Sequence, residues 1–103
     1  MILYNVTVNI DFEVENEWLE WMKSNHIPEV MATGCFIESR MTKVIAEDKG
    51  GATYAVMYLC YNMETYQRYK DKFAAGLQAA HAQKYDGKFA AFRTLMDVVH
   101  QTK

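Results

Sequence analysis

The side chains best suited to proton transfer near neutral pH in this 103-residue chain are its three histidines. His81 follows Leu77 by four residues and therefore lies on or beside the buried face of a predicted helix. Two roles remain open for it: a histidine hydrogen-bonded at a helix end, or a haem ligand, metal ligand or proton shuttle. His26 precedes Pro28 in a predicted break, which is typical of a solvated loop, and His100 is near a predicted frayed end.

Other candidate side chains are two indoles and one guanidinium. Trp18 and Trp21 flank the apolar face of the predicted first helix, where they either pack in the core or hold a planar ligand. Arg93 is inside the predicted last strand, where it either forms an ion pair with Glu38 or Asp97 or holds an anionic ligand. If the protein binds a small molecule, we expect a pocket between helices and sheet, near Trp21, His26 and His81.

Motifs for metals, nucleophiles and phosphates are missing. The histidines have no metal-ligand spacing, and Cys35 and Cys60 form no C-x-x-C, so we predict two reduced thiols, no metal and no cofactor. A disulfide would form only if the fold brought the two cysteines together. Ser24 and Ser39 lack the setting of a nucleophile elbow, and Lys49-Gly50-Gly51 reads as a hairpin tip rather than a phosphate loop. We therefore assign no catalytic residue.

Charge and hydropathy exclude further classes. The net charge is -2 and the 11 Lys and Arg residues are scattered, which argues against a nucleic-acid-binding surface. Residues 49–52 offer only the first two letters of the RNA-recognition signature. No apolar run approaches the roughly 20 residues that a membrane span needs, and the N-terminus does not resemble a signal peptide. We expect a cytoplasmic protein.

Hydrophobic periodicity predicts four strands and two helical regions. Alternation indicates strands, whereas spacings of three and four indicate helices. The central strand, residues 54–61, has no charge and no breaker. The predicted strands are 2–12, 35–46, 54–61 and 88–100. The first predicted helix is 14–25, with a short second piece from Pro28 to Gly34, and the second helix follows Asn62, with its inward residues at Tyr66, Tyr69, Phe73, Leu77 and Ala80 or His81. Turns are expected at 47–51, where Gly50 and Gly51 supply positive φ, and at Asp86-Gly87.

This order predicts an α+β domain of the ferredoxin-like βαββαβ type, spanning residues 1–103 as one domain. Right-handed crossovers place the first and third strands in the centre of a four-stranded antiparallel sheet, with both helices on one face. The third strand is apolar on both sides, so the face without helices is expected to be covered by a second copy in a homodimer. Asn5, Thr7 and Asn9 would form a polar strip on that face, or line a cavity there.

Four segments together resemble a family of short bacterial proteins, mostly from Bacteroidetes, known as a domain of unknown function. They are Ile2-Leu3-Tyr4-Asn5-Val6-Thr7-Val8, Trp18-Leu19-Glu20-Trp21-Met22, His26-Ile27-Pro28 and Ala32-Thr33-Gly34-Cys35-Phe36. The resemblance covers nearly the whole chain. It implies a dimeric α+β barrel and no assigned activity.

The wider barrel superfamily includes antibiotic-biosynthesis-type monooxygenases and haem-degrading enzymes. The haem-degrading members use an Asn of the first strand, a Trp of the second helical region and a His late in that helix. By this resemblance Asn5 or Asn9 matches the Asn, and Ala79-Ala80-His81 is similar to the His segment. The chain departs from that pattern, because residues 62–80 contain no tryptophan.

Two functions from different classes follow. The first is a non-catalytic binding or interaction protein whose open sheet face makes the homodimer, with a small molecule left open as a further partner. The alternative is a cofactor-free or haem-related monooxygenase of the barrel superfamily, with its pocket near the two histidines.

Overall fold

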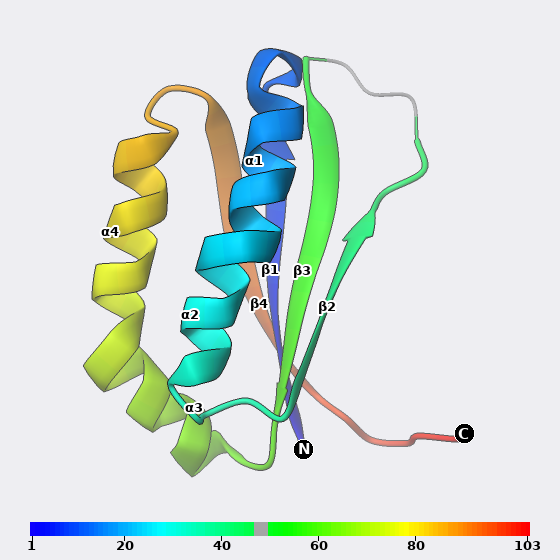
Figure 1. The fold of residues 1–103 in the computed structure, drawn as a ribbon. Coiled ribbons are helices and arrows are strands. Elements are labelled where there is room, and N and C mark those ends of the chain that lie inside the picture. Colours follow the sequence, from blue (N-terminus) through cyan, green and yellow to red (C-terminus); the bar gives the residue numbers. More distant parts are fainter. Residues whose placement is uncertain (47–49) are drawn as a thin grey trace.

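The computed structural model describes residues 1–46 and 50–103, and its elements follow the predicted order (Figure 1). The antiparallel sheet has the strand order β2-β3-β1-β4. Its strands are β1 (Ile2–Ile10), β2 (Glu38–Lys43), β3 (Ala52–Cys60) and β4 (Phe89–Asp97). Both helical arms lie on one face of this sheet, and the C-terminal residues extend past its lower end. The ferredoxin-like βαββαβ prediction, with the first and third strands innermost, is confirmed.

The hydrophobic core lies between the two central strands and the helices. Alternate residues of β1, among them Tyr4 and Val8, are buried against the helices, because successive side chains of a strand point to opposite faces. Strand β1 ends at Ile10, two residues earlier than predicted. The Asp11 carboxylate accepts a hydrogen bond from the Glu13 backbone N–H at 2.8 Å and so starts a helical turn there.

The first helical arm is continuous where the sequence predicts a break. It comprises the 3₁₀ turn η1 (Phe12–Val14), α1 (Glu15–Trp21), the π-helical turn η2 (Met22–His26) and α2 (Ile27–Ala32). The Ile27 N–H bonds to the Met22 carbonyl, five residues back instead of four. In a regular α-helix the Pro28 ring would press against the carbonyl four residues earlier, and the wider turn relieves that conflict. The predicted stop at Gly34 is confirmed by its φ of 76°.

The second helical arm also contains a π-helical turn, and it corrects the predicted buried face. The arm comprises α3 (Met63–Tyr69), η3 (Lys70–Ala74) and α4 (Ala75–Lys84). Phe73 was expected inside, yet it is 36% exposed, whereas Ala74 is 6% exposed. The π turn adds one residue between Tyr69 and the next inward position, so the burial pattern advances by one. Beyond it His81 is buried and Ala80 is exposed.

The turn predicted at residues 47–51 lies partly outside the described residues, since 47–49 are not described. Gly50 and Gly51 have φ of 84° and 154°, so their predicted positive φ is confirmed. A Cβ on Gly51 would come within 2.5 Å of Asn9 Oδ1 and within 2.7 Å of a backbone oxygen of β1. Only glycine fits this approach of the hairpin to the central strand. Strand β2 is shorter than the predicted 35–46, and β4 is shorter than 88–100.

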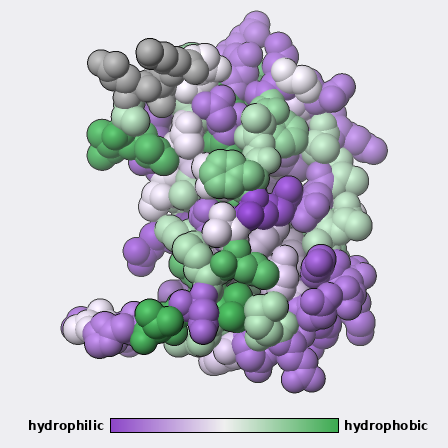
Figure 2. All heavy atoms as spheres, turned by 180° about the vertical axis from the view of Figure 1, so that it is seen from behind, coloured by the Kyte–Doolittle hydropathy of each residue, from purple (hydrophilic) through white to green (hydrophobic). Residues whose placement is uncertain are grey.

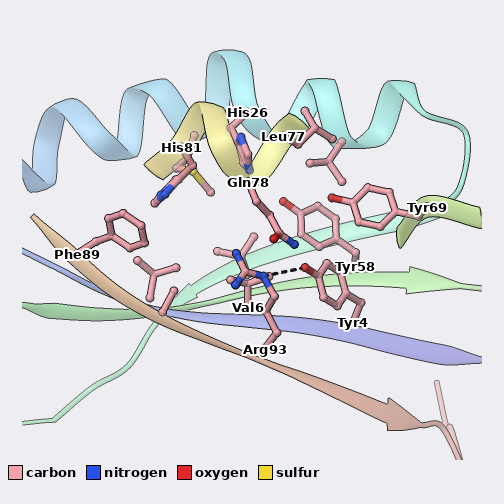
Figure 3. A pocket seen from close by; sticks show the side chains of 15 residues that line it. Tyr4, Val6, His26, Tyr58, Tyr69, Leu77, Gln78, His81, Phe89 and Arg93 are labelled. Carbon is pink, nitrogen blue, oxygen red and sulfur yellow. Dashed lines mark hydrogen bonds between the residues drawn. The ribbon is translucent and has the colours of Figure 1, made fainter. Parts of the chain in front are cut away.

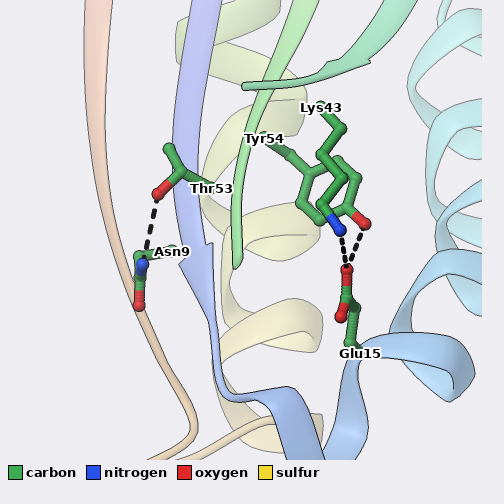
Figure 4. Close-up of polar contacts among 5 residues, drawn as sticks. All are labelled: Asn9, Glu15, Lys43, Thr53 and Tyr54. Atoms are coloured by element: carbon green, nitrogen blue, oxygen red, sulfur yellow. Dashed lines mark hydrogen bonds and ion pairs between the residues drawn. The ribbon is translucent and has the colours of Figure 1, made fainter. Parts of the chain in front are cut away.

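Polar contacts on both faces of β3 hold the elements together (Figure 4). On the helix side, the Tyr54 hydroxyl donates a hydrogen bond of 2.5 Å to Glu15 Oε2, and Lys43 Nζ lies 3.1 Å from the same oxygen. These contacts tie the start of α1 to β3 and β2, and they hold the pKa of Glu15 below its usual value, with the Tyr54 hydrogen bond the largest cause. On the other face, Asn9 Nδ2 donates to Thr53 Oγ1 at 3.2 Å.

The sheet face opposite the helices carries no element of the described chain (Figure 1). Figure 2 looks onto this face, where hydrophobic side chains gather over the sheet among hydrophilic ones. The strand register places the large apolar side chains Leu3, Met57, Leu59, Phe92 and Met96 there, and Phe92 is 63% exposed. Asn5, Thr7 and Asn9 run along the same face, as the alternation predicts.

The two cysteines and the helices bear on the predictions of reduced thiols and of no membrane span. Cys35 and Cys60 are both buried and both free thiols. None of the helices in the described part of the chain has the length and apolar character needed to span a membrane.

Candidate functional site

A cavity of about 40 Å³ lies between the helical arms and the sheet (Figure 3). Strands β1, β3 and β4 form its floor, and side chains from both arms close it from above. A volume of this size holds about three water molecules. Most of its wall is apolar or aromatic, and the polar side chains that reach it are Tyr4, His26, Tyr58, Tyr69, Gln78, His81 and Arg93.

His81 is held by the indole of Trp18. Trp18 Nε1 donates a hydrogen bond to His81 Nε2 at 2.9 Å, and both residues are buried. An indole nitrogen can only donate, so Nε2 must accept and the proton of the neutral imidazole sits on Nδ1. Burial, followed by the neighbouring His26 and Arg93, lowers the pKa of His81 to about 4. At neutral pH His81 is therefore an uncharged ring with one N–H to donate.

His26 reaches the cavity because the π-helical turn η2 turns it inward. Residues five apart face the same way in a π turn, and the His26 ring stacks on Trp21 with centroids 5.1 Å apart. Its ring lies 5.7 Å from that of His81. Nδ1 of His26 is buried and has no hydrogen-bond partner among the described residues. Burial is the main cause of its lowered pKa, and the charge of Arg93 adds to it, while Glu29 opposes them.

Arg93 supplies the positive charge at the cavity. It projects from β4 opposite Val6 of β1, on the helix side of the sheet, and its Nε donates to the Tyr4 hydroxyl at 3.2 Å. Figure 3 shows its guanidinium beside the amide of Gln78. The ion pair predicted with Glu38 or Asp97 is absent, and no other carboxylate of the described residues lies within ion-pair distance of Arg93. None of the described residues that line the cavity is acidic.

The phenols of the cavity are donors rather than bases. Burial raises the pKa of Tyr58 and of Tyr69 well above the usual value of a tyrosine. Their hydroxyls therefore keep their protons at neutral pH. Among the described lining residues, the cavity thus has phenol hydroxyls that donate and one cation, Arg93.

The three residues named from the sequence, Trp21, His26 and His81, do lie together. Trp21 packs on both histidines, with its centroid 5.8 Å from that of His81, but it stands behind His26 and does not line the cavity. The prediction that His26 lies in a solvated loop is wrong, because η2 keeps the chain helical up to Pro28. Arg93, Tyr4 and Gln78 were not grouped with them. Strand alternation could have revealed the first two, since it places both on the helix side of neighbouring strands.

The structure contradicts the match of Asn5 or Asn9 with the asparagine of haem-degrading enzymes. Both side chains lie on the open face of the sheet, because odd positions of β1 point away from the helices. His81 lies on the other side of the sheet, so neither asparagine can share a site with it. His100 bonds to Thr102 in the C-terminal segment. No group of three metal-ligating side chains occurs among residues 1–46 and 50–103.

Solved structures share this fold. A dimeric ferredoxin-like protein from an uncultured marine organism superposes with a TM-score of 0.70 at 17% identity, covering 100% of this chain and 99% of that one. A mutant of SnoaB, a cofactor-independent oxygenase from Streptomyces nogalater, gives 0.67 at 12% identity, covering 97% and 94%. A mutant of MhuD, with two manganese protoporphyrin IX molecules bound per active site, gives 0.70 at 13% identity, covering 100% and 99%. At these identities the likeness establishes the fold.

Sequence comparison gives the family. No curated protein matches the chain. The family model described as "Domain of unknown function (DUF4286)" matches residues 1–99. The match spans all four strands and both helical arms. The chain therefore belongs to the DUF4286 family.

Proposed function

We propose that this protein is a cytoplasmic homodimer that binds a small molecule in the cavity between its helices and its sheet. The observation that carries the proposal is the buried, unpartnered Nδ1 of His26 beside the cavity. A buried nitrogen without a partner costs about 1–3 kcal/mol, which a ligand or an ordered water can offset. The two buried free thiols fit a reducing compartment.

The binding proposal can be tested by NMR with a mixed fragment set. Ligands in the cavity should shift the Trp18 indole N–H signal, because that group bonds to His81. Ala91 lines the cavity, so Ala91→Leu should abolish the shifts by filling it, whereas Ala79→Leu on the exposed face of α4 should not. Fragments that bind equally well to Ala91→Leu, or a set in which none shifts these signals, would refute the proposal.

The dimer proposal is supported by the apolar side chains on the open sheet face. An exposed apolar patch of several hundred Å² is rare on a monomer, and a two-fold contact is the commonest way to cover one. A neighbour in the fold comparison is described as dimeric. Sedimentation at micromolar concentration should give about twice the chain mass of 12.0 kDa.

A matched pair of variants makes that measurement specific. Phe92→Asp adds charge to the open face and should give monomers. Phe73→Asp adds the same charge to an exposed part of the second helical arm and should leave the dimer intact. A wild-type protein that sediments at the mass of one chain would refute the dimer.

The second candidate is a cofactor-free or haem-related monooxygenase, which the presence of His81 and His26 at the cavity favours. Two features count against haem. The cavity is far smaller than a porphyrin, and His81 Nε2 already accepts the Trp18 proton. Titration with haem and with flavin decides the matter: a Soret or visible change that His81→Gln abolishes would support this candidate. We expect no spectral change.

A further inference from the structure

We propose that the cavity takes a small, flat carboxylic acid, with its carboxylate on Arg93 and its apolar body between the sheet and the aromatic walls. This inference rests on the binding function proposed above and names the ligand class. Its basis is an uncompensated guanidinium at a cavity that contains no acidic group among its described lining residues.

The hydrogen bonds around Arg93 leave the donors that a carboxylate needs. Only Nε of Arg93 is engaged, by the Tyr4 oxygen, so both terminal nitrogens lack a partner within the described residues. Because the Tyr4 oxygen accepts that bond, its own hydroxyl proton is free to point at a ligand oxygen. The Gln78 amide lies beside the guanidinium (Figure 3). A guanidinium fork with a neighbouring hydroxyl suits a planar carboxylate, which it can bind through two parallel hydrogen bonds.

The charge of the site selects the sign of the ligand. A cationic ligand would meet Arg93 with no carboxylate to attract it. The two histidines cannot compensate, since both are uncharged at neutral pH and can offer only neutral ring nitrogens. An anion, by contrast, would pair with Arg93, which is exposed at the side of the cavity and has no carboxylate partner among the described residues.

The walls of the cavity select the shape of the ligand. The Phe89 ring lies on one side of the guanidinium, and the Tyr58 and Tyr69 rings lie on the other side (Figure 3). The space of about 40 Å³ is smaller than benzoate itself, so any such ligand must displace wall side chains, and a flat ring requires less displacement than a puckered one. Gln78, which is only partly buried, is the lining side chain expected to move.

The test is a set of four probes whose dissociation constants are measured by NMR or calorimetry. Benzoate carries the expected charge and shape, benzamide is its neutral equivalent, cyclohexanecarboxylate is its puckered equivalent, and phenyl phosphate offers a dianion. We expect benzoate to bind at least tenfold more tightly than benzamide and more tightly than the other two. Arg93→Gln should remove the preference for benzoate over benzamide, and Arg93→Lys should retain only part of it, because lysine lacks the fork.

A matched variant and three outcomes keep the test decisive. Lys72→Gln removes one positive charge from the exposed surface of the second arm and should leave the preference unchanged. Equal binding of benzoate and benzamide, or a preference that survives Arg93→Gln, overturns the carboxylate proposal while the binding function stands. Tighter binding of cyclohexanecarboxylate or phenyl phosphate overturns the stated shape or charge. If none of the four probes binds and the fragment set is also silent, both proposals fall.

Discussion

The burial of His81, which lowers its pKa, predicts that the protein loses stability in mild acid. The folded-state pKa of His81 is about 4, against an ordinary value of 6.5. Between these values the unfolded chain binds a proton at His81 that the folded chain excludes. The contribution of His81 to the free energy of unfolding is therefore full above about pH 6.5 and is lost as the pH falls towards 4. From pH 7.5 to pH 5.0 these values give a loss of about 2 kcal/mol, and solvent in the cavity reduces it to about 1–2 kcal/mol.

The perturbation that isolates this effect is His81→Gln. A glutamine amide oxygen can accept the Trp18 N–H but does not titrate, so the variant should lose most of the dependence on pH between 7.5 and 5.0. The assay is urea unfolding at several pH values and one fixed protein concentration, because a dimer's stability depends on concentration. His26 contributes a slope of the same sign. His100→Gln, at an exposed site, is the control and should behave as wild type.

The reasoning fails if His81→Gln keeps the full wild-type slope. That result would mean that the acid dependence comes from other groups, and hence that burial does not keep His81 unprotonated in the folded protein. It would also remove the assignment of the His81 proton to Nδ1.

Three further changes test the local geometry. Gly51→Ala should lower the free energy of unfolding by about 1–3 kcal/mol in urea titrations, since its Cβ has no room, whereas Gly76→Ala, with open space on a helix, should raise it by up to about 1 kcal/mol; equal effects would contradict the close approach at the hairpin. Tyr54→Phe should raise the pKa of Glu15 towards its usual value, which NMR titration of the carboxyl would show, and should weaken stability above that pKa while leaving it less dependent on acid. Phe73→Ser should lower the thermal midpoint less than truncation of a fully buried ring would, because Phe73 is 36% exposed; a drop as large as that of a core ring would contradict the shifted register of the second arm.

Strand positions and their order could be predicted from the sequence because strand alternation is a short-range property. The apolar and polar positions of residues 2–10 alone separate the two faces of β1, and the uncharged run at 54–61 predicts a central strand. The same alternation could have excluded Asn5 and Asn9 from the histidine site, because they stand at odd positions.

The site could be predicted only in part, because it depends on the two π-helical turns. Regular helical spacing places Phe73 inward and leaves His26 in a loop; one inserted residue per arm reverses both results. Pro28 was a visible signal for the first turn, but proline usually indicates a break rather than a wider turn. Nothing in the spacing of residues 70–74 marks the second. Whether Arg93 has a carboxylate partner depends on which side chains the neighbouring strands and helices place beside it. The sequence of β4 alone does not contain that information.

The paired π turns also bear on how the chain can vary among its relatives. Each arm carries one residue more than an uninterrupted α-helix of the same reach would use. Deleting a single residue from 22–26 or from 70–74 would rotate everything downstream by about a quarter of a turn, which for the first arm moves α2 and for the second moves His81. Members of the family with a one-residue gap at either place should therefore lack the histidine pair, and an alignment can settle this without any experiment on the protein itself.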